Sequence, residues 1–134
     1  MDWRDGQDST FILDSGCAVL NLTEDVRVFA AVVARKSEFA IETLQTAEGV
    51  RLTDCMAYHV LKLHRMDEDK DRPALWMTLE YSVTQKPFMG FNRAQAAVIE
   101  LAVLVSRLHL LPIEKVLQEM QYLQIAIDKT AGVR

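Results

Sequence analysis

The sequence lacks the short motifs that mark many enzymes and metal proteins. Its two cysteines, Cys17 and Cys55, form no CxxC pair, and we expect both to be reduced packing residues. There is no nucleophile elbow, P-loop or GxGxxG fingerprint. Two of the three histidines, His59 and His64, are five residues apart on one predicted strand, so they point to opposite faces and cannot share a metal by themselves. The sequence therefore predicts no metal site.

Strong net charge and long apolar runs are also missing. The 134 residues carry a formal net charge of −4, which gives no general basic footprint for nucleic acid. The apolar run 94–105 is too short and too interrupted to span a bilayer, and the acidic, polar first ten residues are not a secretory signal. We therefore expect a cytoplasmic protein that binds neither nucleic acid nor membrane. The length suits a single domain, 1–134, with its own core.

The first part of the chain reads as strand, helix and loop. Residues 1–10 are polar and are expected to be frayed or extended. A turn at 14–16 precedes a buried strand at 17–20. Thr23 is the predicted N-cap of a short amphipathic helix that ends at Arg35 and Lys36. Residues 37–55 favour a loop with a short helix or strand and a turn at Glu48-Gly49.

The central part of the chain predicts a β-hairpin. Residues 56–66 and 74–85 alternate between apolar and polar side chains and are rich in aromatic and β-branched residues. The charged segment 67–73 between them reads as a solvated hairpin tip. Residues 1–90 are therefore expected to form a small antiparallel sheet with one helix, within an α+β fold.

Residues 91–132 predict a helical hairpin. Asn92 is the expected cap of a long helix that is apolar nearly all round, and Pro112 opens a second, amphipathic helix. A helix without a polar face has to be covered on most sides. We expect it to be covered by the sheet, by the next helix and by a second chain, in a homodimer or a hetero-oligomer.

The few charges of the long helix follow one stripe. Arg93, Glu100 and Arg107 recur every seven residues. Seven residues span about 10.5 Å of helix, so these groups do not simply pair with one another. Their partners have to come from elsewhere. One interpretation is salt bridges to acids such as Glu80 or Asp128, or across a dimer; the other is an anionic ligand such as a phosphate, which arginine suits.

Two segments resemble the domain of unknown function 447 family. The upstream segment is Ala18 to Val26, with Phe29 as its aromatic, and it resembles the family's strand-to-helix segment. The downstream one is longer and more specific. It comprises Phe91-Asn92-Arg93-Ala94, Ala97-Val98-Ile99-Glu100, Ser106-Arg107-Leu108-His109-Leu110-Leu111 and Asp128-Lys129-Thr130-Ala131-Gly132.

This resemblance implies an FMN-binding split-barrel flavoprotein. The resemblance also implies a homodimer with a flavin near the subunit interface. Members of the family occur in archaea and in bacteria with tetrahydromethanopterin-linked one-carbon pathways. The family's reaction is not established. A typical member has further N-terminal residues that supply the first barrel strands, so here we expect a partial split barrel with an exposed sheet edge.

The same resemblance supplies cofactor-binding candidates. Ser9 and Thr10 match the family's phosphate-contacting segment loosely, and Asn21, Arg93 and Arg107 complete the set. Two hypotheses follow, and the sequence leaves open whether the protein is an enzyme. In the first, the chain is a flavoprotein-like module that binds FMN, a candidate reductase in one-carbon metabolism. In the second, it is a non-catalytic subunit that has lost flavin binding and completes its barrel with a partner chain.

Overall fold

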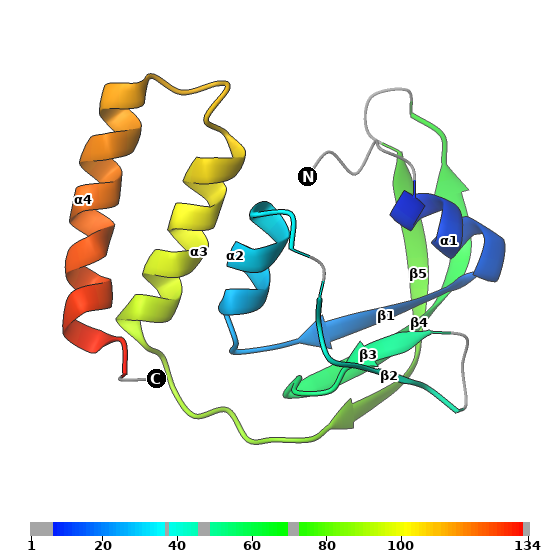
Figure 1. Cartoon of the computed structure of the whole chain (residues 1–134). Helices are drawn as coiled ribbons and strands as arrows, with labels where there is room; N and C mark the ends of the chain where they lie inside the picture. The colour runs from blue at the N-terminus through cyan, green and yellow to red at the C-terminus, as the bar shows by residue number, and fades with distance from the viewer. Residues whose placement is uncertain (1–6, 37, 46–48, 70–72, 133–134) are drawn as a thin grey trace. The chain divides into compact units, whose positions relative to one another are not determined.

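The computed structural model describes residues 7–36, 38–45, 49–69 and 73–132, and the side chains from residue 11 onward within these ranges. The fold is α+β, as predicted (Figure 1). In chain order the elements are α1 (Gln7–Ser15), β1 (Cys17–Leu22), α2 (Arg27–Val33), β2 (Ile41–Thr43), β3 (Val50–Leu52), β4 (Ala57–Asp67), β5 (Ala74–Thr84), α3 (Arg93–Ser106) and α4 (Ile113–Thr130). None of the described helices is long and apolar enough to cross a membrane.

The described residues form two compact units. The first, the sheet unit, comprises residues 7–23 and 40–87 and contains α1 and all five strands. The second, the helical unit, comprises residues 24–39 and 88–132 and contains α2, α3 and α4. Each unit is therefore built from two separate stretches of the chain.

The sheet unit is organised around the predicted hairpin. β4 pairs with β5 and also with β1, both antiparallel, so the strand order is β1-β4-β5. Two register shifts interrupt the β4–β5 ladder. They leave Glu80 as the extra residue on β5 and His64 as the extra residue on β4. Of the predicted hairpin tip, residues 67–69 and 73 are described and 70–72 are not.

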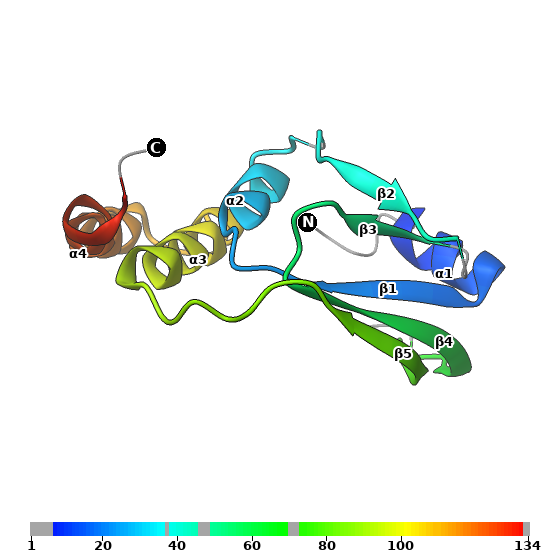
Figure 2. The ribbon, with the colours of Figure 1, turned by 90° about the horizontal axis from the view of Figure 1, so that it is seen from below.

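A second, short hairpin lies over one side of this sheet. β2 pairs antiparallel with β3 within residues 37–55, where a loop with a short helix or strand was predicted, and β3 contacts β1 (Figure 2). The Arg51 guanidinium stacks over the Tyr58 ring of β4, with 5.6 Å from its carbon to the ring centroid. Val60 of β4 is completely buried. Of the predicted turn Glu48-Gly49, only Gly49 belongs to the described residues.

The N-terminal prediction was wrong. Residues 7–10, expected to be frayed or extended, and residues 14–15 of the predicted turn belong to helix α1. The Ser15 hydroxyl donates to the Phe11 carbonyl oxygen at 2.8 Å, and Gly16 ends the helix with a φ of +67°, a left-handed conformation that glycine adopts without strain. Strand β1 then begins at Cys17 as predicted, but its residues are half-buried or exposed rather than buried.

The start of α2 also differs from the prediction. The helix begins at Arg27, with Val26 rather than Thr23 at its N-cap position. Asp25 accepts a hydrogen bond from the Arg27 N–H at 3.1 Å and also pairs with the Arg27 side chain. A carboxylate thus satisfies one of the free N–H groups of the first turn, which is the role expected of Thr23.

The helical hairpin confirms the C-terminal prediction. The Asn92 Oδ1 atom accepts from the Ala94 N–H at 2.8 Å and caps α3. Pro112 stands at the N-cap of α4, one residue before its first helical residue. The buried residues of this hairpin are small or apolar: Ala94, Ala97, Leu104, Val116 and Ala126. Large apolar side chains of α3 nevertheless remain exposed within this chain, including Ile99 at 40% and Val103 at 39%.

Candidate functional site

Asn21 is held by the backbone of its own unit. Its Oδ1 accepts the Leu52 N–H at 2.8 Å, and its Nδ2 donates to the Val19 carbonyl oxygen at 3.3 Å. The side chain therefore straps β3 to β1. An amide has two donors and an acceptor with two lone pairs, so part of its capacity remains for a ligand. The prediction that Asn21 contacts a cofactor stays a prediction, alongside a clear structural role.

Ser9 and Thr10 belong to helix α1, in the same unit as Asn21. Their side chains lie outside the described part of the structure, so the predicted phosphate contact stays a prediction. Helix α1 directly precedes strand β1, which carries Asn21, and the two elements are in contact.

The two candidate arginines lie in the helical unit, at opposite ends of α3. Arg93 is its first residue, and Arg107 is its C-cap, whose N–H donates to the Leu104 carbonyl oxygen at 3.1 Å. Both are exposed, and within the described residues neither they nor Glu100 form an ion pair. Asp128 lies in the same unit as both arginines, and no ion pair joins it to either guanidinium among the described residues. Glu80 lies in the sheet unit, so its proposed salt bridge stays a prediction. An anionic ligand and a dimer contact both remain open.

An open face of the three-stranded sheet was not identified from the sequence. Val19, Asn21 and Tyr58 face the β2–β3 hairpin, as their contacts with Gly49, Leu52 and Arg51 show. Side chains alternate along a strand, and cross-strand partners share a face. The opposite face consequently carries large apolar side chains: Leu20 at 48%, Leu22 at 40% and Leu79 at 56% exposure, with Leu61 half-buried.

A histidine–serine pair lies within this open sheet face. His59 pairs with Leu20 on one side and with Ser82 on the other. Its Nδ1 lies 2.7 Å from the Ser82 Oγ, so the two share a hydrogen bond. In the sequence, the alternation of side chains along residues 57–61 indicated that His59 and Leu61 share one face of a strand. The sequence could not show that β1 and β5 extend it on both sides, because strand order depends on long-range pairing.

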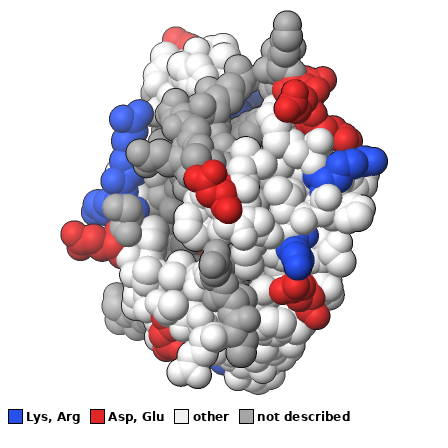
Figure 3. All heavy atoms as spheres, turned by 90° about the vertical axis from the view of Figure 1, so that its right-hand side faces the viewer, with Lys and Arg blue, Asp and Glu red and all other residues white. Residues whose placement is uncertain are grey.

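The charges of the sheet side are scattered. In Figure 3 the acidic and basic side chains stand among uncharged surface, and several lie beside a side chain of opposite sign. In the sheet unit, Lys86 forms an ion pair with Asp54. Among the residues whose side chains are described, no three His, Cys, Asp or Glu groups are arranged to hold a metal ion. The open sheet face itself carries the exposed leucines named above and the His59–Ser82 pair.

The family comparison supports the C-terminal resemblance. Residues 92–134 match the C-terminal model of the family described as "Protein of unknown function (DUF447)". No curated protein matches the sequence. The resemblance noted at Asn92 to Gly132 is therefore confirmed for this segment.

Three solved structures share the fold. The FMN-bound protein MM1853 from Methanosarcina mazei, of the DUF447 family model, is similar with a TM-score of 0.75 and 19% identity, over 95% of this chain and 70% of that chain. BorF, the flavin reductase component of a bacterial two-component tryptophan halogenase, is similar with a TM-score of 0.51 and 12% identity, over 62% of this chain and 58% of that chain. The NADH:FAD oxidoreductase SgcE6 of Streptomyces globisporus C-1027 is similar with a TM-score of 0.50 and 10% identity, over 61% of this chain and 54% of that chain. At these identities the likeness establishes the fold.

Proposed function

Because residues 92–134 carry the C-terminal region of the DUF447 family on a fold shared with flavoproteins, we propose that this chain is a flavin-binding module whose cofactor is FMN. The observation that carries the proposal is the likeness to an FMN-bound protein over 95% of this chain. Two further similar folds, a flavin reductase component and an NADH:FAD oxidoreductase, support a flavin rather than another cofactor.

The residues present suit the two ends of FMN. A phosphate needs cationic or N–H donors, and Arg93 and Arg107 offer guanidinium groups that no described carboxylate occupies. Within the sheet unit, a flavin ring needs an apolar surface with a few polar contacts, a character that the open sheet face with His59 and Ser82 shares. Asn21 lies on the opposite face of that sheet. The cofactor-binding candidates of this proposal are Ser9, Thr10 and Asn21 in the sheet unit and Arg93 and Arg107 in the helical unit.

The flavin would supply the electron transfer, and the chain would bind it, orient it and exclude water. We propose a reductase role linked to tetrahydromethanopterin-dependent one-carbon metabolism as the finer function. The support for this step is the occurrence of the resembling family in organisms with that pathway. Its test is whether the protein loaded with chemically reduced flavin is reoxidised by a pterin substrate and not by an unrelated acceptor.

Flavin binding is tested by titrating the purified protein with FMN and following flavin fluorescence and calorimetric heat. We expect saturable binding, and we expect Arg93→Gln to weaken it about tenfold or more, since it removes a charge-assisted contact to phosphate. Riboflavin, which lacks the phosphate, should bind wild type and Arg93→Gln alike. Absence of FMN binding at millimolar concentration would refute the proposal.

A second candidate function is favoured by the open sheet face. Exposed leucines on β1 and β5, together with β5 as the outer strand of the described sheet, are typical of a surface that another chain covers. In this alternative the protein is a non-catalytic assembly module that pairs with itself or with a chain supplying further strands. Native mass spectrometry of gently purified protein distinguishes the two, because a flavin-free hetero-complex supports the alternative and a flavin-loaded homodimer supports the first.

A further inference from the structure

The open end of the helical hairpin brings two cationic residues together. Arg93 is the first residue of α3, and Lys129 lies in the last turn of α4. The Asn92 Nδ2 donates to the Thr130 carbonyl oxygen at 3.1 Å, and this bond joins the residues next to the two cations (Figure 1). Both cationic residues are exposed, and neither forms an ion pair among the described residues. This end of the hairpin therefore offers two positive charges to a ligand.

The loop before α3 displays two aromatic rings beside these cations. Phe91 is 100% exposed and Phe88 is 57% exposed, and their ring centroids lie 5.1 Å apart in an edge-to-face arrangement. The loop is held on both sides of Phe91, because Glu24 accepts the Met89 N–H at 3.1 Å and Asn92 caps α3. A ring displayed by a tied loop is a preformed contact surface, since little ordering remains to be done when a ligand binds.

Two acids of the helical unit belong to the same region, and each accepts a hydrogen bond from a neutral donor. The Asp128 Oδ1 accepts from the Gln124 Nε2 at 2.7 Å, one turn back along α4. Glu24 accepts the Met89 N–H of the loop, as described above. Neither carboxylate pairs with a cation among the described residues of this region. The guanidinium and ammonium groups are consequently available to an external anion.

From these features we infer that the open end of the helical hairpin binds a nucleotide, a ligand that joins an aromatic ring to a phosphate. Arg93 and Lys129 hold the phosphate by charge-assisted hydrogen bonds, and the ring stacks on Phe91. The Cα atoms of Phe91 and Arg93 are at most about 7 Å apart, so one small molecule can reach both. FMN belongs to this ligand class and shares Arg93 with the flavin proposal, but the inference does not require that FMN be the ligand.

The test uses FMN and AMP, each with its phosphate-free counterpart, riboflavin and adenosine. Each is titrated into the isotopically labelled protein, and backbone amide shifts are followed by NMR. We expect a phosphate form to shift amides of residues 88–95 and 127–132 and to bind about fivefold more tightly than its counterpart, as exposed charge interactions allow. Such shifts with FMN alone identify a flavin site, and such shifts with AMP in protein saturated with FMN identify a second nucleotide site. FMN that shifts only amides of the sheet unit would retain the flavin proposal and overturn this inference.

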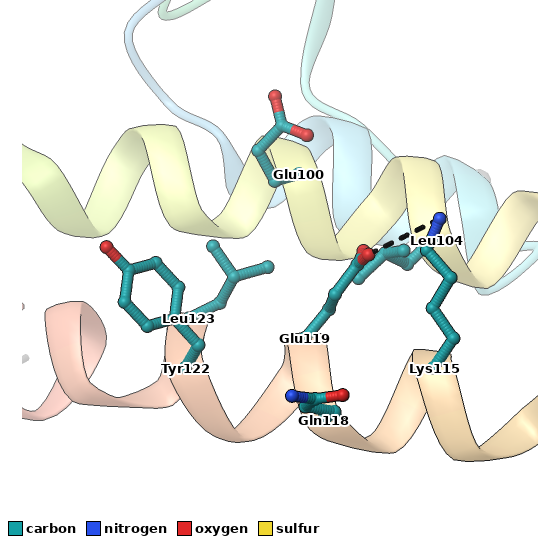
Figure 4. A pocket seen from close by; sticks show the side chains of 7 residues that line it. All are labelled: Glu100, Leu104, Lys115, Gln118, Glu119, Tyr122 and Leu123. Carbon is teal, nitrogen blue, oxygen red and sulfur yellow. Dashed lines mark ion pairs between the residues drawn. The ribbon is translucent and has the colours of Figure 1, made fainter.

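Lys129→Gln and Lys115→Gln form a matched pair of variants for the phosphate contact. Each removes one positive charge from an exposed position of α4, but Lys115 lies in the first turn of the helix and pairs with Glu119 at 3.7 Å (Figure 4). Lys129→Gln should weaken binding of the phosphate form about threefold to fivefold and leave its phosphate-free counterpart unchanged. Lys115→Gln should change neither affinity.

Phe91→Ala tests the ring contact, with Leu110→Ala as its control. Leu110 is 70% exposed and lies between the two helices, at the other end of the hairpin. Phe91→Ala should weaken the phosphate and phosphate-free forms alike, about fivefold or more, as loss of a stacking ring does. Leu110→Ala should weaken neither. Equal effects within either pair of variants, equal binding with and without the phosphate, or no shifts at all would each overturn the inference.

Discussion

Asn92 is joined to Thr130 across the open end of the helical hairpin. The Asn92 Nδ2 donates to the Thr130 carbonyl oxygen at 3.1 Å, while its Oδ1 caps the Ala94 N–H. The first residue before α3 is thereby linked to the last residue of α4, 38 positions away. One side chain thus both starts a helix and closes the hairpin.

This double role predicts a graded response to substitution. Asn92→Ala removes both bonds and should lower the free energy of unfolding by about 1–2 kcal/mol, the usual cost of losing a cap. Asn92→Asp keeps the capping acceptor and loses only the donor to Thr130, so its loss should be smaller. Urea denaturation followed by circular dichroism measures both. Equal destabilisation by the two variants would contradict the separation of cap and closure.

Gly49 is predicted to be intolerant of any side chain. A Cβ atom at this position would lie 2.7 Å from Val19 Cγ2, closer than non-bonded carbon atoms approach. Gly49→Ala should therefore destabilise the sheet unit by about 1–3 kcal/mol through overpacking. Denaturant unfolding gives the value.

The control for this prediction is Gly132→Ala, because a Cβ at Gly132 meets no atom within 4 Å. It should leave stability within about 0.5 kcal/mol of wild type, as surface substitutions usually do. Adding Val19→Ala to Gly49→Ala makes room for the new methyl group. The double variant should then lose less stability than the sum of the two single variants, which would not hold if the clash were absent.

Substitutions at Asn21 can separate an effect on folding from an effect on flavin binding. Asn21→Ala leaves the Leu52 N–H without its acceptor and should cost about 1–3 kcal/mol of stability. Asn21→Asp keeps an acceptor for that N–H and should retain most of the stability. If Asn21 also contacts the cofactor phosphate, the added carboxylate should weaken FMN binding in a folded protein. Unchanged FMN affinity in Asn21→Asp would assign Asn21 a structural role alone.

The open sheet face predicts a charge-sensitive assembly. Leu79→Glu places a carboxylate on a leucine that is 56% exposed within this chain. If another chain covers this face, the buried charge should shift the protein toward monomer in analytical ultracentrifugation. Gln121→Glu, on the exposed side of α4, adds the same charge elsewhere and should leave the mass unchanged. A monomeric wild-type protein, or a Leu79→Glu variant with unchanged mass, would show that the face is uncovered.

Local sequence signals predicted the elements whose stability is local. The alternation of residues 56–85 gave the β4–β5 hairpin, and Asn92 and Pro112 marked the starts of α3 and α4. Helix α1 was missed because Asp, Ser and Thr favour caps and turns over helix interiors, and its contact with β1 was invisible in the sequence. The bulges at Glu80 and His64 arise from strand pairing, which periodicity alone does not reveal.

The candidate site was predictable only in part. The spacing of Arg93, Glu100 and Arg107 predicted one stripe of charges on a helix; all three residues are exposed, and Arg107 is the C-cap of α3 rather than one of its helical residues. The strap made by Asn21 was not predictable, because it depends on a β3 strand of three residues that lies 31 positions away. The His59–Ser82 pair depends equally on the register of two strands. Residues that meet through long-range pairing carry no local signature.

The interleaving of the two units limits how this fold can be divided. The chain passes from one unit to the other after Thr23, after Phe39 and after Pro87. Helix α2 contacts α3, yet it stands between β1 and β4 in the sequence, although those two strands are neighbours in the sheet. The segment 92–134 therefore cannot be exchanged between proteins as an independent unit. A recombinant that exchanges this segment among relatives keeps the packing of α3 only if residues 24–39 are inherited with it.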